Sequence, residues 1–163
     1  MTHYTLTDLL SEQSVSVALS ATTKGDCIHE LVACIEKTGR ISDAASVQAA
    51  LLAREHNAST AIEGGIALPH IQSAYAKAAC MAFGISRNGI AFSANDGELT
   101  HFFALAVAPE ADSASYLTTL VELIDKLRNN SVQKKLFACK TNEELYKRLL
   151  GYEHVMVPLP PMH

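Results

Sequence analysis

Apolar residues along this chain recur at two different spacings, and the two patterns alternate from one end of the chain to the other. Spacings of three and four residues predict a helix that begins at about Thr23 and ends at Gly39. A second helix is expected from Ser42, as its cap, to a position near His56. Further helices are expected at residues 5–10 and 73–78, from Ser113, from Ser131, and from Thr141 to Leu149 with Gly151 as the stop. The helix from Ser113 is expected to bury an apolar stripe that comprises Leu117, Leu120, Val121 and Ile124.

Strand patterns fill the intervals between these helices. Residues 13–19 alternate between apolar and polar side chains, which is typical of a strand with one buried face. Residues 79–86 and 99–108 are almost continuously apolar, as in strands that are buried on both faces. Turn signals at Asn88-Gly89 and at residues 95–97 imply that some of the strands pair in antiparallel fashion.

The alternation of helices and strands predicts an α/β fold, a single domain with a mixed (parallel and antiparallel) central sheet and helices on both faces. The length of 163 residues and the hydrophobic content of 48% suit one core of this kind. We expect the domain to occupy residues 1–150 and the proline-containing residues 151–163 to form a loose tail.

The charge, the hydropathy and the cysteine positions indicate which partners, location and cofactors to expect. The net charge is −4 and no basic cluster is present, which argues against nucleic acid and anionic membranes. The chain lacks an apolar run of the roughly 18 residues that a membrane span needs, and its N-terminus does not resemble a signal peptide. We therefore expect a cytoplasmic protein with no direct membrane insertion. The four cysteines lack metal-ligand spacing, so we expect buried, reduced thiols, no metal and no cofactor.

The candidate chemistry lies between Arg54 and His70, in the segment R-E-H-N-A-S-T-A-I-E-G-G-I-A-L-P-H. Gly64-Gly65 opens a short apolar strand at residues 66–68, and paired glycines can present backbone N–H groups to an anion. Pro69 is expected to end this strand and to take the chain out of the sheet as it reaches His70. Ligands commonly bind at strand ends in α/β proteins, and a hydrogen-bonded structural histidine is the alternative for this position.

This segment resembles the phosphorylation-site signature of the enzyme IIA domains of the fructose/mannitol type in the bacterial sugar phosphotransferase system, including their nitrogen-regulatory relatives. The signature begins with an acidic or amide residue and ends with an apolar-Ala-apolar-Pro-His run. The matching positions here are Glu55, Ile62, Gly64-Gly65, Ile66-Ala67-Leu68 and Pro69-His70. The similarity of layout extends over roughly residues 5–150, and the family has a fold of the kind that the pattern predicts.

The resemblance implies that His70 accepts a phosphoryl group and that Arg54, in the last turn of its helix, pairs with the phosphoryl oxygens. Imidazole suits this role because one of its nitrogens is free to act as a nucleophile at neutral pH. Gly64, Gly65 and the polar turn with Thr60 are expected to bind the phosphate through loop N–H groups. An exposed cation that interacts favourably with the helix dipole is the alternative for Arg54.

Three positions depart from the family pattern. Glu63 and Ile71 stand where the family has small residues. Glu63 would repel an arriving phosphoryl group if it lies close to His70, whereas it has little effect if it points into solvent or pairs with Arg54. Tyr116 stands where family members commonly carry a second histidine. It acts either as a neutral hydrogen-bond donor to the phosphoryl group or as an amphipathic cover at the start of a helix.

The resemblance therefore implies a phosphotransferase component of the sugar phosphotransferase system. His70 would take a phosphoryl group from the phosphocarrier protein HPr and pass it to a cysteine of an enzyme IIB, a separate chain, for sugar uptake. A nitrogen-regulatory signalling module, in which the phosphorylation state changes the bound partner, is one alternative. A degenerate scaffold without phosphotransfer, marked by Glu63 and Tyr116, is the other.

Overall fold

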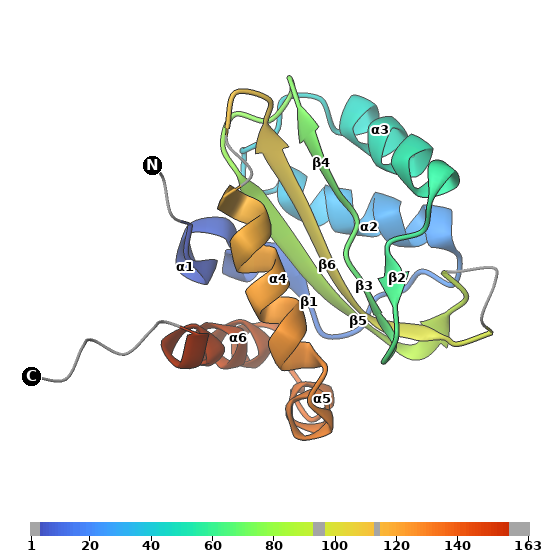
Figure 1. The fold of residues 1–163 in the computed structure, drawn as a ribbon, viewed down its shortest axis with the longest axis vertical. Helices are drawn as coiled ribbons and strands as arrows, with labels where there is room; N and C mark the ends of the chain where they lie inside the picture. The colour runs from blue at the N-terminus through green and yellow to red at the C-terminus, as the bar shows by residue number, and fades with distance from the viewer. Residues whose placement is uncertain (1–3, 93–96, 113–114, 157–163) are drawn as a thin grey trace, which may run out of the picture.

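The sheet is the centre of the fold in this computed structural model, which describes residues 4–92, 97–112 and 115–156 (Figure 1). The described residues include six strands: β1 (Val15–Ser16), β2 (Ala61–Ile62), β3 (Ile66–Ala67), β4 (His70–Ser73), β5 (Cys80–Ile90) and β6 (Thr100–Pro109). They lie in the order β1-β5-β6-β3-β2, and β4 also pairs with β6. Because β5–β6 and β2–β3 are antiparallel and the other pairs are parallel, the predicted mixed sheet is confirmed.

Helices cover both faces of this sheet, as predicted (Figure 1). The helices α2 (Lys24–Glu36) and α3 (Ala44–Asn57) pack against one face. On the other face the core draws on α1 (Leu6–Leu9), α4 (Ser115–Leu127), α5 (Asn130–Phe137) and α6 (Asn142–Met156). A short 3-10 helix, η1 (Glu12–Ser14), leads into β1.

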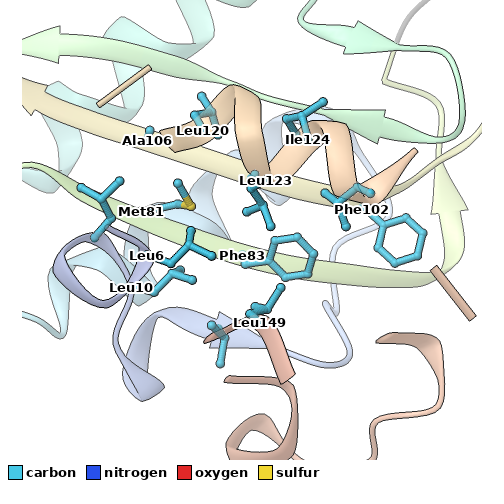
Figure 2. Packing of buried hydrophobic residues seen from close by; sticks show 14 of the residues in the cluster. Leu6, Leu10, Met81, Phe83, Phe102, Ala106, Leu120, Leu123, Ile124 and Leu149 are labelled. Atoms are coloured by element: carbon cyan, nitrogen blue, oxygen red, sulfur yellow. The ribbon is translucent and has the colours of Figure 1, made fainter. Parts of the chain in front are cut away.

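The core beneath α4 depends on the side-chain alternation of β6. Phe102 and three alanines, at positions 104, 106 and 108, point to this face. The alternate residues Phe103, Leu105 and Val107 point to the α2–α3 face. Figure 2 shows Ala106 beside Leu120 of α4. The small alanine side chains leave space for the helix, so α4 packs directly along β6, the strand that pairs with β4.

Two helix starts differ from the prediction because another side chain accepts the free N–H groups of the first turn. Thr23, the predicted start of α2, is its cap and accepts a hydrogen bond from the backbone N–H of Asp26. The cap of α3 is Asp43 instead of Ser42, whose backbone N–H and hydroxyl both donate to the carbonyl of Tyr75. Similarly, Asn129 caps α5 and accepts the N–H of the predicted cap Ser131. The predicted start of α4 at Ser113 lies outside the described residues.

The strands also differ from the prediction in their lengths. β1 is shorter than residues 13–19, since η1 occupies the first part and the N–H of Val17 donates to Asn142 in α6. No turn interrupts β5 at Asn88-Gly89; the strand continues to Ile90 through an irregularity in its register with β6. The helix predicted at residues 73–78 is wrong, because an isolated bridge holds this segment in antiparallel pairing with the loop after α2.

Two helices depart from their predicted limits or faces. The buried side of α4 includes Tyr116, Leu120 and Leu123, whereas Val121, predicted to be on the inner stripe, is 56% exposed. The last helix continues through Gly151 to Met156, so the first part of the predicted loose tail is helical. Residues 157–163 lie outside the described chain.

Arg87 of β5 donates hydrogen bonds to backbone carbonyls of two segments, one after β1 and one at the end of α5. Its Nε donates to the carbonyl of Val17 at 2.9 Å, its Nη2 to Cys139 at 2.9 Å, and its Nη1 to Phe137. The guanidinium also lies over the ring of Phe137, at 5.1 Å from the ring centroid. One side chain therefore connects the segment after β1 to the end of α5.

Arg87→Met is expected to lower the free energy of unfolding by about 2–4 kcal/mol, since each hydrogen bond to a charged group contributes about 1.5–3 kcal/mol. Methionine keeps the apolar stem but cannot donate to the three carbonyls. Urea unfolding followed by circular dichroism measures the change. The control is Arg128→Met, at an exposed position after α4, with an expected change below about 0.5 kcal/mol. Equal stabilities of the two variants would contradict this role of Arg87.

Candidate functional site

His70 is the first residue of β4, and its place in the sheet sets the direction of its side chain. Its Cα partner on β6 is Ala106, which belongs to the core beneath α4. Paired residues on neighbouring strands point to the same face, so the imidazole lies on the α4 side of the sheet. The residue is partly buried there, accessible to a partner but supported by the strand.

The prediction that the chain leaves the sheet at Pro69 is wrong. The carbonyl of Pro69 accepts the N–H of Ala106 at 2.9 Å, and β4 then continues along the same edge of β6 as β3. A proline lacks only the donor, and this side of the ladder needs its acceptor. His70 is therefore held by regular strand pairing and not by a loop.

The hydrogen bond of the imidazole fixes its tautomer. Nδ1 of His70 lies 2.7 Å from the carbonyl oxygen of Leu68. Because a carbonyl only accepts, the neutral ring carries its hydrogen on Nδ1 and keeps a free lone pair on Nε2. Nε2 is thus the ring atom with a lone pair available for nucleophilic attack.

Arg54 lies in the last turn of α3 and reaches forward into the following loop, as predicted from its position. Its Nη1 donates to the carbonyl of Ala58 at 2.7 Å. The same loop continues to Thr60, whose carbonyl accepts the N–H of Leu68 at 3.3 Å. The loop that Arg54 contacts therefore pairs with the segment that leads into His70.

Glu55 is the residue near the site whose role the sequence did not reveal. Although charged, it is only 3% exposed, and its Oε2 accepts the N–H of Thr60 at 3.0 Å and pairs with Nζ of Lys24 at 3.4 Å. The hydroxyl of Thr60 donates to Oε1 of the same carboxylate. Thr60, predicted to bind phosphate, thus has both its N–H and its hydroxyl bonded to Glu55 in this structure. Glu55 was visible in the sequence only as the acidic position of the signature.

The paired glycines lie far along the strand from His70. The N–H groups of Gly64 and Gly65 both donate to Oε1 of Glu98, at 3.0 and 3.1 Å. Ile66, which follows them, and His70 keep the same register on β6, so extended chain with a rise of about 3.3 Å per residue separates their Cα atoms by about 13 Å. The expectation that these two N–H groups cradle a phosphoryl group on His70 does not fit this geometry.

Glu63 lies in the turn between β2 and β3, where it is exposed. It lines an open groove of about 620 Å³ together with Arg128 and with Ala61, Ile62 and Gly64. The Glu63 carboxylate therefore faces solvent, which is one of the arrangements expected from the sequence. It precedes the glycines and therefore lies still farther than they do from His70.

Tyr116 lies in the first turn of α4 and is 3% exposed. Its ring packs into the core on the face of the sheet that carries His70. Burial raises the pKa of Tyr116 above its ordinary value, so its hydroxyl stays protonated at neutral pH. The tyrosine therefore covers the start of the helix, and its hydroxyl can only serve as a neutral group.

The described part of the chain shows neither a metal-binding cluster nor a membrane-spanning helix. Among the described residues, no group of three or more His, Cys, Asp or Glu side chains is arranged to hold a metal ion. None of the described helices has the length and apolar character needed to cross a membrane.

Most of the chain matches a known protein family. Residues 8–151 match the profile of the family described as "Phosphoenolpyruvate-dependent sugar phosphotransferase system, EIIA 2". The fructose-specific EIIABC component of Bacillus subtilis is 28% identical over 140 residues, which cover 86% of this chain but 22% of that protein. A nitrogen regulatory protein of Bradyrhizobium diazoefficiens is 30% identical over 145 residues, which cover 88% of this chain and 94% of that protein.

Solved structures give the same fold. The nitrogen regulatory protein IIA-Ntr from Neisseria meningitidis superposes with a TM-score of 0.78 at 26% identity, covering 86% of this chain and 96% of that chain. Enzyme IIA of the mannitol system of Escherichia coli, solved in complex with phosphorylated enzyme IIB, has a TM-score of 0.72 at 18% identity. That alignment covers 87% of this chain and 97% of that chain.

The tautomer of His70 can be measured directly. In a long-range ¹H–¹⁵N spectrum at about pH 8, where an ordinary imidazole is neutral, we expect the His70 ring to carry its hydrogen on Nδ1. The spectrum of His70→Ala assigns the signals. His101 is an internal reference, because its Nδ1 lies 2.9 Å from the carbonyl of Ser86 and has the same tautomer. A hydrogen on Nε2 of His70 would contradict the orientation described here.

Proposed function

The chain belongs to the phosphoenolpyruvate-dependent sugar phosphotransferase system EIIA 2 family, and from this membership we propose that it is a cytoplasmic phosphocarrier that holds a phosphoryl group on His70. The observation that carries this proposal is the hydrogen bond from Nδ1 of His70 to the carbonyl of Leu68, which leaves Nε2 free. A nitrogen lone pair held at an accessible strand position is what in-line attack on a phosphorus atom requires.

The proposed reaction has two steps. Nε2 of His70 attacks the phosphorus atom of phosphorylated HPr; the new P–N bond forms as the bond to the donor's histidine breaks and that histidine leaves. In the second step a thiolate of an enzyme IIB attacks the same phosphorus, and Nε2 leaves with the electron pair. The carbonyl of Leu68 stabilises the Nδ1–H group throughout, since the ring becomes more positive when Nε2 is phosphorylated.

Arg54 and Tyr116 are proposed to act on the phosphoryl oxygens. The guanidinium of Arg54 would exchange the carbonyl of Ala58 for two phosphoryl oxygens, which it can bind in bidentate fashion. The hydroxyl of Tyr116, which remains protonated, would donate one neutral hydrogen bond from the first turn of α4. This assignment omits Gly64 and Gly65, whose N–H groups are bonded to Glu98.

The face of the sheet that carries His70 has exposed apolar side chains, which suit a transient protein partner. Val121 on α4 is 56% exposed, and Leu117, one turn earlier, is partly exposed. Leu68 is also partly exposed and packs against the same core as Leu117. Apolar side chains grouped on an accessible face are typical of the centre of an interface. We propose that HPr and a separate enzyme IIB bind this face in turn. The mannitol IIA of Escherichia coli, which has the same fold, forms a complex with its phosphorylated IIB.

A regulatory role is the second candidate. The alignment covers 94% of the nitrogen regulatory protein of Bradyrhizobium diazoefficiens but only 22% of the fructose-specific protein of Bacillus subtilis. The 30% identity to that nitrogen regulatory protein supports a signalling module in which phosphorylation of His70 changes the bound partner. Both candidates need the same phosphohistidine, and a scaffold without phosphotransfer needs none.

Incubation with phosphoenolpyruvate, enzyme I and HPr is expected to add one acid-labile phosphoryl group to the full chain. Intact-protein mass spectrometry measures the gain, and His70→Ala is expected to show none. Absence of the gain in the wild-type chain with donors from several species would reject both phosphorylated candidates. Loss of the group on addition of a fructose- or mannitol-type IIB distinguishes the sugar carrier from the regulatory module.

Arg54→Met is expected to slow phosphorylation of His70 by roughly 100-fold, the cost of removing one positioned donor to a developing charge. The measurement is the single-turnover rate with phosphorylated HPr in excess. Arg128→Met removes an exposed cation from the groove lined by Glu63 and controls for the change in net charge. Similar rates for the two variants would show that Arg54 only caps its helix.

A further inference from the structure

A buried carboxylate lies behind the candidate site and has no part in the proposed reaction. Glu55 is only 3% exposed, and it accepts three interactions: the N–H and the hydroxyl of Thr60 and the ammonium group of Lys24. Lys24 itself is held over the ring of Phe92, with Nζ 4.8 Å from the centroid. A buried charge is costly unless it is paired and hydrogen-bonded in this way, so its position is well determined.

Both carboxylate oxygens of Glu55 accept hydrogen bonds from Thr60, and these two bonds fix the orientation of the backbone at Thr60. Oε2 accepts the N–H at 3.0 Å while Oε1 accepts the hydroxyl. Two bonds between the same two residues prevent rotation of Thr60 about either one. The carbonyl of Thr60 therefore points in a set direction, toward the N–H of Leu68, which donates to it at 3.3 Å.

Leu68 connects Thr60 to the imidazole of His70 through its two backbone polar groups. Its N–H is bonded to Thr60, and its carbonyl accepts Nδ1 of His70 at 2.7 Å. A continuous series of polar contacts thus runs from Glu55 through Thr60 and Leu68 to His70. Every member is a hydrogen bond whose donor and acceptor are assigned without ambiguity, because carboxylate and carbonyl oxygens only accept.

We propose that Glu55 and Thr60 are positioning residues for His70, and that Lys24 holds the carboxylate in place. They touch neither the phosphoryl group nor the imidazole; they fix the carbonyl of Leu68, which in turn holds the ring in the Nδ1–H tautomer with Nε2 free. The consequence for phosphotransfer rests on the proposed function, whereas the consequence for the tautomer does not.

Thr60→Val in the full chain tests this proposal, because valine has the shape of threonine but no hydroxyl. We expect the His70 ring to populate both tautomers in the long-range ¹H–¹⁵N spectrum. The maximal rate of phosphorylation by HPr should fall about 10-fold, as a small misplacement of a reacting group can cause, with KM for HPr unchanged. Thr60→Ser, which keeps the hydroxyl, should restore both the tautomer and the rate.

A wild-type tautomer and rate in Thr60→Val would overturn the proposal. Equal loss in Thr60→Val and Thr60→Ser would also overturn it, since the hydroxyl would then be irrelevant. If Thr60→Val does not fold, Lys24→Met, which removes the partner of Glu55 from its partly exposed side, is expected to give the same change in tautomer. If the wild-type chain is not phosphorylated at all, the proposed function fails, and the spectra of the unphosphorylated proteins still decide whether Thr60 positions His70.

Discussion

The register of two short strands on one edge of β6 is the constraint on which the rest of the site depends. β3 pairs Ile66 with Phe102, and β4 pairs His70 with Ala106, so the chain stays extended across Pro69. This register places His70 on the face that α4 covers, because paired residues share a face. A shift of one residue would turn the imidazole toward α2 and α3, on the opposite face of the sheet.

The fold could be predicted from the sequence where a local rule was sufficient. The apolar stripe and cap of α2 and the continuous apolar run of β6 are such cases, since period and capping act over a few neighbouring residues. Where the prediction failed, a distant group had decided the outcome. Ser42 is not a cap because it is bonded to Tyr75, and Asn88-Gly89 makes no hairpin because β6 pairs with Ile90 beyond it.

At the candidate site, too, local features could be predicted from the sequence and long-range contacts could not. The place of His70 at the end of a short apolar segment and the place of Arg54 in the last turn of its helix follow from local patterns, and both were accessible from the sequence. The hydrogen bonds of the Gly64 and Gly65 N–H groups could not be predicted from the sequence. Their acceptor, Glu98, lies 34 and 33 residues further along the chain. Glu55 was equally hidden, since nothing in a helical pattern shows that a charged residue is enclosed by Thr60 and by Lys24 from another helix.

The bond between Nδ1 of His70 and Leu68 also has a consequence for how modification of this chain is detected. A phosphorylated histidine exists as two positional isomers, according to which ring nitrogen carries phosphorus. With Nδ1 occupied by its hydrogen, only the isomer substituted at the nitrogen remote from the main chain is accessible. Phosphorus found on Nδ1 of His70 would therefore report a chain in which the bond to Leu68 is broken, whereas phosphorus on Nε2 is compatible with the folded site.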